Sequence, residues 1–393
     1  MSQLLNERWS ETKEALLEGL SGVRKSSMSV CLENTRKYLA ESATAGATSS
    51  GNIATLNRVI LPVIRRVMPT VIANEIIGVQ PMTGPVGQIH TLRVRYADTS
   101  SGDSIVAGDE ALSPFNIAAA YSGNNVDGTP KANTTSVLEG QPGKRMSIQI
   151  LKAPVEAKSR KLSARWTFEA AQDAQAQQGI DIEAEIMAAL AQEITAEIDQ
   201  EILTSLRALA SVEQTYDQSL VSGTATFVGD EHAALAIQIN RVANLIAQRT
   251  RRGAANWAVV SNQALTILQS ATTSAFARTT EGTFEAPTNT KFVGTLNGAM
   301  RIYVDAYKTD TDDNNQVLVG YKGTSEADAA AFYCPYIPLM SSGVVLDPAT
   351  FEPVVGFLTR YGYVELNNTA SSLGNAADYL GKVAITSATV SFK

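Results

Sequence analysis

Histidine and cysteine are scarce in this sequence, and their scarcity excludes several kinds of catalytic site. The 393 residues include two histidines, His90 and His232, and two cysteines, Cys31 and Cys334. Two histidines nearly exclude histidine-based metal centres and Ser-His-Asp catalysis. Two cysteines far apart in the chain form no disulfide framework, so a reducing compartment is the simplest interpretation. Because no phosphate loop or dinucleotide fingerprint is present either, we expect no enzyme active site and no cofactor.

The sequence also lacks long apolar runs and an excess of positive charge. No stretch approaches about 18 apolar residues, so no helix is expected to span a membrane, and the N-terminus lacks the apolar core of a signal peptide. The formal net charge of −7 argues against a dedicated nucleic-acid-binding protein, which normally has a basic domain. Charged residues make up 18% of the chain, below the roughly 25% usual for soluble domains, which suggests that protein partners cover much of the surface.

Residues 180–209 are predicted to form one long helix around which the chain is organised. About 30 residues correspond to roughly 45 Å at ~1.5 Å per residue. Because a four-residue repeat drifts by about 40° per step around a helix, its two ends are expected to pack on different layers. An ordinary buried core helix is the alternative. The apolar residues of the repeat, which no Pro or Gly interrupts, are Ile182, Ile186, Leu190, Ile194, Ile198, Ile202 and Leu206.

Two blocks of opposite charge lie before and within this helix. Seven bases and one acid lie between Lys144 and Arg165, whereas nine acids and no base lie between Trp166 and Ser205. Three glutamates of the acidic block repeat every four residues, and like charges at that spacing cost about 0.2–0.5 kcal/mol per pair unless they are offset. A solvated acidic face is one interpretation. We predict instead that the blocks face each other, within a subunit or between copies, through Lys158, Arg160, Lys161 and Arg165 on one side and Glu193, Glu197 and Glu201 on the other.

A third basic cluster follows a second predicted helix at 235–246. Arg249, Arg251 and Arg252 stand at its end, before a glycine. Such a cluster can meet phosphate or the carboxylates of a neighbouring copy, and a solvated helix end is the alternative.

Residues 310–314 mimic the first ligands of a calcium loop. However, Asn315 and Tyr321 stand where that loop requires Gly and a bidentate Glu. We therefore interpret the run as a polar hairpin turn between strands at 303–307 and 317–321.

Alternating apolar residues predict strands at 92–96 and 146–150, on either side of a long segment at 98–143. That segment carries six acids and one lysine. The simplest assembly is a long hairpin-like arm with a loose tip. Because an isolated two-stranded ribbon is marginal in water, another copy of the protein is expected to supply the surface on which the arm lies. A disordered surface loop is the alternative.

The remaining elements are mixed in kind. Residues 1–50 begin with an amphipathic helix and pass into a linker-like run, so we interpret them as an arm that packs on something else. Because strands and helices do not alternate regularly, we predict an α+β fold. A helix is expected at 263–270, and short strands are expected at 164–168, 257–260, 300–304, 317–321, 331–334, 357–364 and 383–392.

Several blocks of unusual composition follow one another between about Arg58 and Tyr363. They are Val79-Gln-Pro-Met-Thr-Gly-Pro-Val-Gly-Gln88, Val155-Glu-Ala-Lys158, Ser163-Ala-Arg-Trp-Thr-Phe-Glu-Ala-Ala-Gln-Asp173, Arg252-Gly-Ala254, Gly320-Tyr-Lys-Gly323, Phe332-Tyr-Cys-Pro-Tyr-Ile-Pro338 and Gly356-Phe-Leu-Thr-Arg-Tyr-Gly362. In order and composition these blocks closely resemble the major capsid proteins of T-even-type tailed phages, over roughly three quarters of the chain.

The resemblance implies the Johnson fold, also called the Hong-Kong-97-type fold. Its parts are an N-terminal arm, an extended loop, a peripheral domain crossed by a spine helix, and an axial domain. In this sequence the arm would be 1–57 and the axial domain 213–350. The peripheral domain would be 58–212, including the extended loop at about 88–169 and the spine helix at about 180–211. Residues 351–393 would return to it and form the C-terminal tail.

The resemblance also implies a function and partners. Copies would form hexameric, and also pentameric, capsomers of an icosahedral head that encloses double-stranded DNA without sequence-specific binding. Assembly would take place in the bacterial host cytoplasm, with scaffold, portal and vertex or decoration proteins. Family members commonly lose an N-terminal piece after a Leu-x-Glu triplet, which Leu39-Ala40-Glu41 offers at Glu41, but we expect an uncut arm here. The alternatives are an encapsulin-like compartment shell and a soluble enzyme of unknown class.

Overall fold

The structure is a computed structural model of the chain. It describes a few helical residues between 9 and 22, and then residues 25–34, 71–99, 106–108, 111, 121–126, 129–139, 143–178, 181–217, 228–250, 252–271, 276–278, 291–305, 316–324, 328–350, 352–366 and 376–387.

The chain divides into two compact units, each assembled from segments that are distant in sequence. Unit 1 consists of Met1–Gly87, Pro154–Thr204 and Phe332–Val364. Unit 2 consists of Gln88–Ala153, Ser205–Ala331 and Glu365–Lys393. Long helices occur together with separate sheets that contain parallel and antiparallel pairs, so the predicted α+β class is confirmed.

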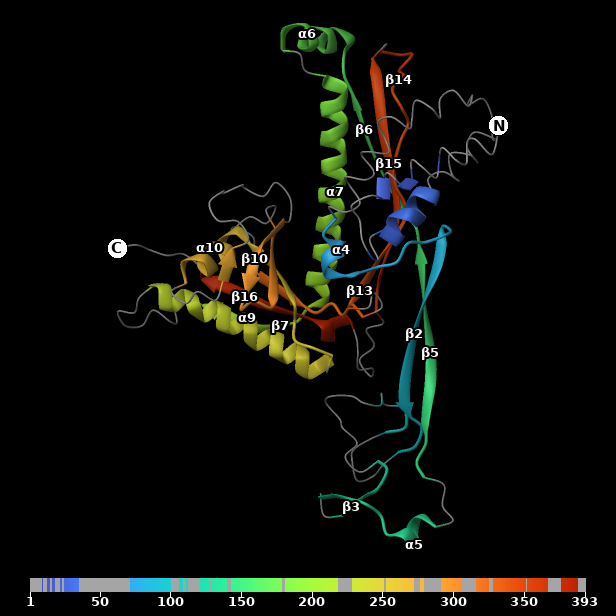
Figure 1. The fold of residues 1–393 in the computed structure, drawn as a ribbon, viewed down its shortest axis with the longest axis vertical. Coiled ribbons are helices and arrows are strands. Elements are labelled where there is room, and N and C mark those ends of the chain that lie inside the picture. The colour runs from blue at the N-terminus through green and yellow to red at the C-terminus, as the bar shows by residue number, and fades with distance from the viewer. Residues whose placement is uncertain are drawn as a thin grey trace. The chain divides into compact units, whose positions relative to one another are not determined.

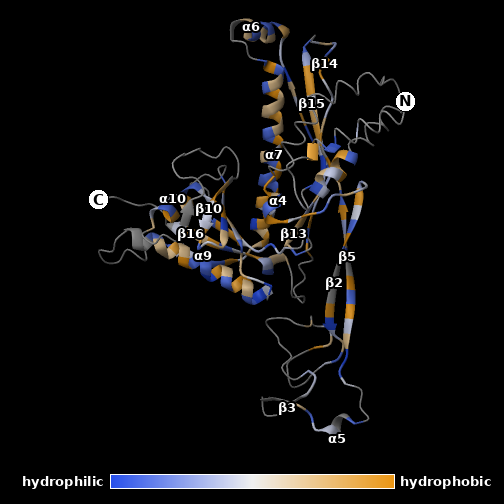
Figure 2. Cartoon of the chain, in the orientation of Figure 1, coloured by the Kyte–Doolittle hydropathy of each residue, from blue (hydrophilic) through white to orange (hydrophobic). Residues whose placement is uncertain are grey.

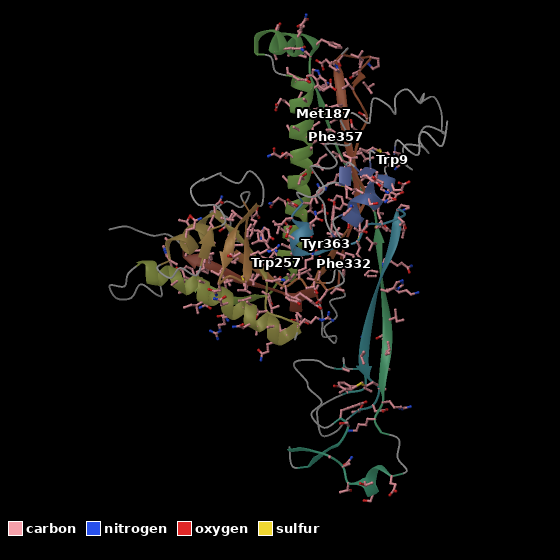
Figure 3. All side chains as sticks on the ribbon, viewed as in Figure 1. Trp9, Met187, Trp257, Phe332, Phe357 and Tyr363 are labelled. Carbon is pink, nitrogen blue, oxygen red and sulfur yellow. The ribbon has the colours of Figure 1, made fainter. Side chains whose placement is uncertain are left out.

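Unit 1 is built on a five-stranded sheet in which β15 (Pro353–Glu365) pairs with three other strands. From Pro353 to Arg360 the residues of β15 alternate between buried and half-buried, as expected for a strand with one face on a core. Phe357 is one of the buried side chains (Figure 3). The other strands are β1 (Gly78–Val79), β13 (Ala331–Ser341), β14 (Val345–Leu346) and β6 (Lys158–Arg165).

The predicted long helix is confirmed as α7 (Ile182–Leu209), which runs beside β6 and β15 of unit 1 (Figure 1). Asp181 caps its start, because its Oδ1 accepts a hydrogen bond from the Glu183 amide at 3.1 Å. The isoleucine repeat is half-buried at the start of the helix and fully buried by Ile202. The drift of the repeat predicts such a change, and the boundary between the two units falls inside the helix after Thr204.

Residues 25–34 form a helix that packs on unit 1 of its own chain. Asn34 fixes its end, since Nδ2 donates to Met82 O at 2.7 Å and to Tyr336 O at 3.1 Å. The apolar side chains of the helix are buried, with Cys31 fully so. The described part of the predicted arm therefore belongs to the core of its own chain, because its apolar face finds a surface there.

Both cysteines are buried in unit 1. Cys31 lies in the helix at 25–34 and Cys334 lies in β13, and neither is in a disulfide. Burial raises the pKa of each thiol to about 12. Both thiols are therefore protonated at neutral pH.

Unit 2 is built on a seven-stranded sheet with α9 (Val228–Thr250) along it (Figure 1). Apolar residues of α9 and α10 (Asn262–Ser270) join those of the strands in one core. Gly320 is needed next to the buried Trp257 (Figure 3), because a Cβ there would overlap the indole ring. In spatial order the strands are β7 (Val212–Asp217), β16 (Leu380–Ser387), β12 (Gln316–Gly320), β8 (Trp257–Ser261), β11 (Met300–Asp305), β10 (Lys291–Leu296) and β9 (Phe276–Arg278).

The position of β8 corrects the hairpin that the sequence predicts between 303–307 and 317–321. β8 lies between β11 and β12, parallel to the first and antiparallel to the second. All five of its residues are buried. A strand that is apolar on both faces is most stable at the centre of a covered sheet, and this outweighs the closeness of β11 and β12 in sequence.

The strand predicted at 164–168 ends early. β6 stops at Arg165, and α6 (Phe168–Gln178) begins three residues later. The Ala170 amide donates to Thr167 Oγ1 at 3.3 Å, which caps the first turn of the helix. The alternation of Trp166 and Phe168 with polar residues therefore misidentified a helix start as a strand end.

Strand pairing also divides the chain differently from the domain plan. The sequence predicts that 351–393 rejoins the peripheral domain, whereas β16 pairs with β7 and β12 in unit 2. Conversely, β14 and nearly all of β13, which fall within the predicted axial domain at 213–350, pair in the sheet of unit 1. Pairing between distant strands sets these boundaries, and a linear division of the sequence does not capture it.

The two strands predicted on either side of 98–143 form a separate ribbon. β2 (Val86–Tyr96) pairs only with β5 (Met146–Glu156) among the described strands. The loop between them contains β3 (Asn124–Val126), β4 (Thr129–Lys131) and α5 (Thr135–Leu138).

Candidate functional site

Arg160 of β6 joins two of the predicted glutamates on α7. Its Nη1 lies 2.8 Å from Glu197 Oε2, and its Nη2 contacts the carboxylate of Glu201. Its Nε donates to the Tyr361 hydroxyl at 2.6 Å, and that hydroxyl donates in turn to Glu201. One guanidinium thus offsets the repulsion between glutamates one turn apart and fastens the helix to the sheet. For these residues the two charge blocks do face each other within one subunit.

Burial and hydrogen bonding act in opposite directions on this cluster. Burial disfavours the charged form of Glu201, but hydrogen bonds from Tyr361 and Arg160 outweigh it, so the pKa of Glu201 lies below its usual value. Burial likewise lowers the pKa of Arg160, and the bonds to Glu201 and Tyr361 more than reverse that effect. Burial and the bond to Glu201 raise the pKa of Tyr361. The ion pair therefore stays charged at neutral pH beside a neutral phenol.

The other predicted members of the two blocks lie on the surface of unit 1. Lys158 and Lys161 are exposed on β6 and Glu193 is exposed on α7, and within the described part of the chain none of them has an ion pair. Arg165 Nη1 lies 4.0 Å from Glu352 Oε2, with 66% of the arginine side chain exposed. These exposed charges are the part of the two blocks that can meet another molecule.

Arg249 and Arg252 form ion pairs inside unit 2. Arg249 Nη1 lies 2.6 Å from Glu213 Oε1 on β7, and Arg252 Nη1 lies 2.7 Å from Asp328 Oδ1. Burial disfavours charge on Glu213, but the hydrogen bond from Arg249 outweighs it and lowers the pKa of the carboxyl. Both arginines thus have partners in their own chain, and a contact of either with another copy stays a prediction.

Sequence reasoning missed the most deeply buried ion pair. Arg207, in the last turn of α7, places Nη2 at 2.7 Å from Asp305 Oδ2 at the end of β11, and the two side chains are 10% and 0% exposed. Lys382 Nζ donates to the Arg207 carbonyl at 3.0 Å. A cation at a helix C-terminus is favourable by itself, so nothing about its position in the sequence pointed to a partner on a distant strand.

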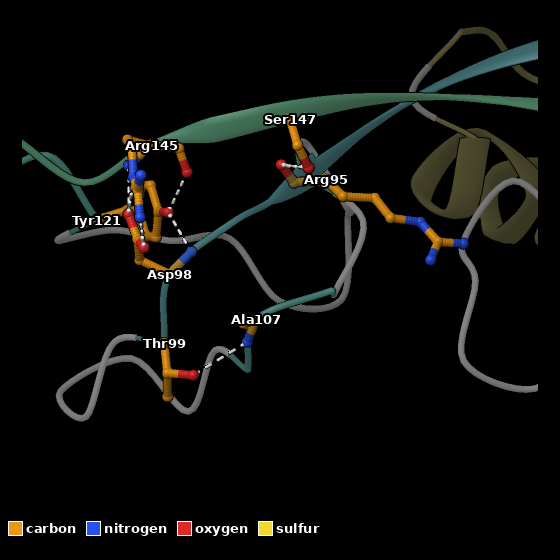
Figure 4. A network of polar contacts seen from close by, with 7 residues as sticks. All are labelled: Arg95, Asp98, Thr99, Ala107, Tyr121, Arg145 and Ser147. Atoms are coloured by element: carbon orange, nitrogen blue, oxygen red, sulfur yellow. Dashed lines mark hydrogen bonds and ion pairs between the residues drawn. The ribbon is translucent and has the colours of Figure 1, made fainter.

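A polar network joins the end of the ribbon to its loop (Figure 4). The Arg145 amide donates to Asp98 Oδ2 at 2.7 Å, and Arg145 Nη2 lies 3.2 Å from Asp98 Oδ1. The Tyr121 hydroxyl donates to the Arg145 carbonyl at 2.5 Å and accepts from the Asp98 amide at 3.2 Å. The Tyr121 ring also packs on Tyr96, with centroids 4.5 Å apart, beside the buried Ala111. The described part of the loop is therefore fastened to the ribbon, and the disordered-loop alternative does not hold for it.

One face of β5 exposes three apolar side chains in a row. Met146, Ile148 and Ile150 are 55%, 68% and 60% exposed, and Figure 2 shows apolar residues along this strand. Exposed apolar residues that occur singly are ordinary, but a contiguous row on a protein surface usually marks a contact with another molecule. This apolar row, Met146 to Ile150, is the clearest candidate for a functional surface.

A hollow of about 390 Å³ lies on the sheet of unit 1 between β6, β13 and β15. Its lining includes the apolar side chains of Leu162, Met340 and Phe357, and Lys161 is its one charged residue. A catalytic pocket needs several converging polar groups, which this lining does not provide.

Metal sites and membrane spans were sought in the described part of the chain. No group of three or more His, Cys, Asp or Glu side chains gathers there in an arrangement that can hold a metal ion. No described helix is both long and apolar enough to cross a membrane. The predicted contact residue Arg251, the predicted cleavage residue Glu41 and the calcium-like run 310–314 lie outside the described residues.

Comparisons with known proteins agree with the resemblance seen in the sequence. A family model described as major capsid protein Gp23 matches residues 53–385. The major capsid protein of Vibrio phage KVP40 is 28% identical over 428 residues, covering 85% of this chain and 81% of that protein. Those of Enterobacteria phage T4 and Escherichia phage AR1 are 29% and 30% identical over 429 residues, covering 86% of this chain and 80% of each relative.

Solved structures with a similar arrangement are also capsid or phage proteins. One from Microbacterium phage Oxtober96 has a TM-score of 0.46 at 10% identity, covering 80% of this chain and 90% of that chain. The capsid protein in the structure of the capsid of Myoviridae phage XM1 has a TM-score of 0.43 at 11% identity, covering 79% and 90%.

Proposed function

The chain belongs to the Gp23 family of major capsid proteins, and from this premise we propose that identical copies form the capsomers of an icosahedral phage head that encloses double-stranded DNA. Membership in the family makes the chain a structural protein of the virion capsid, where copies assemble with one another. Hexameric capsomers, and pentamers at the vertices, are the finer part of the proposal. The family match does not favour the encapsulin-like alternative.

The apolar row on β5 is the observation that carries this proposal. A two-stranded ribbon is marginal in water by itself, and this one leaves Met146, Ile148 and Ile150 more than half exposed. A soluble monomer gains nothing from such a surface and risks aggregation. In a shell, a neighbouring copy covers the row, so that assembly removes the apolar area from water.

The Hong-Kong-97-type plan assigns a role to each unit. Unit 1, with its five-stranded sheet and α7, corresponds to the peripheral domain, and the seven-stranded sheet of unit 2 corresponds to the axial domain at the capsomer centre. The β2–β5 ribbon and its loop correspond to the extended loop. Lys158, Lys161 and Glu193, exposed and without an ion pair among the described residues, are the charges we propose to meet other copies.

The same plan extends to partners and place. We propose assembly in the host cytoplasm with scaffold and portal proteins, and with vertex or decoration proteins on the finished head. The net charge of −7 supports an inner wall that holds DNA without tight phosphate contacts, since basic contacts would hinder its release.

Electron microscopy of the purified full-length protein tests the proposal. The expected result is closed shells or capsomer-sized rings, together with sedimentation velocity that shows mass increasing with protein concentration. A compact monomer at every concentration would refute it. Shells purified from infected cells should contain DNA, whereas an enzyme cargo inside them would instead support a compartment protein.

A further inference from the structure

The ribbon has one unbroken antiparallel register. At one end the Ala97 amide donates to Arg145 O at 3.0 Å, and at the other the Ala157 amide donates to Pro85 O at 2.9 Å. Between these pairs β2 and β5 have the same length of 11 residues, which leaves no room for an inserted residue. Facing pairs in such a ladder alternate between pairs that exchange hydrogen bonds and pairs whose N–H and C=O groups point away from each other.

This register fixes which backbone groups point out of the ribbon. Ala97 and Arg145 form a bonded pair, so the next pair, Tyr96 and Met146, points outward, as does every second residue after it. The β2 side agrees, because the Tyr96 carbonyl accepts an outside bond from the Gly108 amide at 2.8 Å. On β5 the outward residues are Met146, Ile148, Ile150, Lys152 and Pro154.

The two edges of the ribbon are completed differently. The loop of the same chain covers the outer edge of β2, through the Gly108 bond and a second bond from the Ala111 amide to the Val94 carbonyl at 2.8 Å. No described strand covers the outer edge of β5. The ribbon is therefore closed on one side and open on the other.

The open edge of β5 coincides with the apolar row. Soluble proteins usually protect an exposed edge with charges or proline, because bare N–H and C=O groups recruit other strands. Here the protection stands only at the ends of the stretch: Lys144 and Arg145 precede it, and Lys152 and Pro154 follow it. Pro154 lacks an N–H at an outward position, so a strand that pairs with this edge must stop there.

We propose that the open edge of β5, from Met146 to Lys152, pairs with an extended strand of a second copy of this chain. The proposal rests on the proposed function, which brings copies together. Backbone bonds to the outward groups would supply affinity, and the apolar row would supply contacts for alternate side chains of the added strand. The bases at both ends of the stretch favour a strand with acidic neighbours, which a chain of net charge −7 can provide.

The added strand is expected to come from a different segment of the partner than β5 itself. Two β5 strands paired symmetrically about Ile148 would place Lys144 opposite Lys152 twice. Like charges directly opposite each other destabilise a strand pair. The pairing is therefore unlike a simple two-fold contact between ribbons.

Hydrogen exchange resolved to single amides tests the pairing directly. In the unassembled chain, the inward amides Ser147 and Gln149 should be protected by β2, while the outward amides of Ile148 and Ile150 exchange freely. Assembly should slow the outward amides by at least about 100-fold and change the inward ones little. Outward amides that exchange equally fast in shells and in the unassembled chain would overturn the proposal.

A matched pair of variants separates the backbone bond from the side chain. Ile148→Pro removes one outward N–H and leaves the bonds to β2 intact, whereas Ile148→Ala keeps the N–H and shortens the side chain. We expect Ile148→Pro to reduce shell yield at least about tenfold beyond Ile148→Ala, with unchanged protection of the inward amides. Equal yields of the two variants would overturn edge pairing while leaving the capsid function in place. If the wild-type chain itself fails to assemble, the proposed function falls, and this inference falls with it.

Discussion

Replacing Arg207 with methionine should destabilise unit 2 strongly. The change keeps most of the side-chain length but leaves the fully buried Asp305 carboxylate without the guanidinium that lies 2.7 Å away. Removing one partner of a buried ion pair typically costs about 3–5 kcal/mol, because the remaining charge has lost its solvation and its counterion. We expect the Arg207→Met variant to lose free energy of unfolding in that range, since the two side chains are 10% and 0% exposed.

Fluorescence of Trp257 can follow this loss in unit 2 alone. The chain has three tryptophans, and replacing Trp9 and Trp166 with phenylalanine leaves Trp257, which is buried in the seven-stranded sheet, as the reporter. Urea titrations of the unassembled protein then give a midpoint and a slope, and an unchanged slope identifies a true change in stability.

The double variant Arg207→Met with Asp305→Asn is the control. Removing the charge from the second partner should restore at least about half of the lost free energy, because an unpaired buried carboxylate causes most of the penalty. A loss of less than about 1 kcal/mol in the single variant would show that the pair is accessible to water and would refute the reasoning. A double variant that loses the sum of two independent penalties would refute it as well.

Three further predictions concern the sheets and the charged surface. Glu201 has a pKa below the ordinary 4.5, so its stabilising contribution is complete above that pH and is lost as pH falls through the folded-state pKa; the difference in urea midpoint between wild type and Glu201→Gln should therefore shrink between pH 7 and pH 3, and a constant difference would contradict this. Lys158→Glu combined with Lys161→Glu should reduce shell yield in electron micrographs yet change the free energy of unfolding by no more than about 0.5 kcal/mol, and normal shells would rule out a role of these lysines between copies. Gly320→Ala should cost about 1–3 kcal/mol in the Trp257 fluorescence assay, because the new methyl group overlaps the indole ring, and a neutral result would mean that the strands shift without strain.

Much of the local structure could be predicted from the sequence, because helices and strands carry their own periodicity. The four-residue repeat identified α7, and alternation identified both strands of the ribbon and the central strand β15. The facing of the two charge blocks could also be predicted, because seven bases and nine acids in adjacent stretches need compensation. Which of the bases would provide it could not: Arg160 does, while Lys158 and Lys161 stay exposed on the same strand.

The long-range pairings could not be predicted, because no local pattern encodes them. The insertion of β8 between β11 and β12, and the addition of β16 to the sheet of unit 2, depend on packing across the whole unit. The same holds for Arg249 with Glu213 and for Arg252 with Asp328, which are 36 and 76 residues apart. Each arginine looked like a free cation in the sequence because its partner stands on a distant element.

The burial of both native cysteines has a practical consequence for chemical labelling. With a thiol pKa of about 12, Cys31 and Cys334 present roughly one thiolate in 100,000 molecules at pH 7, and alkylating reagents and disulfides react with the thiolate form. A cysteine introduced at an exposed position such as Ile148 would therefore be the only fast-reacting thiol among the described residues. Fluorophores or cross-linkers can then be attached there without first removing the natural cysteines, and the labelled protein can report on when copies meet.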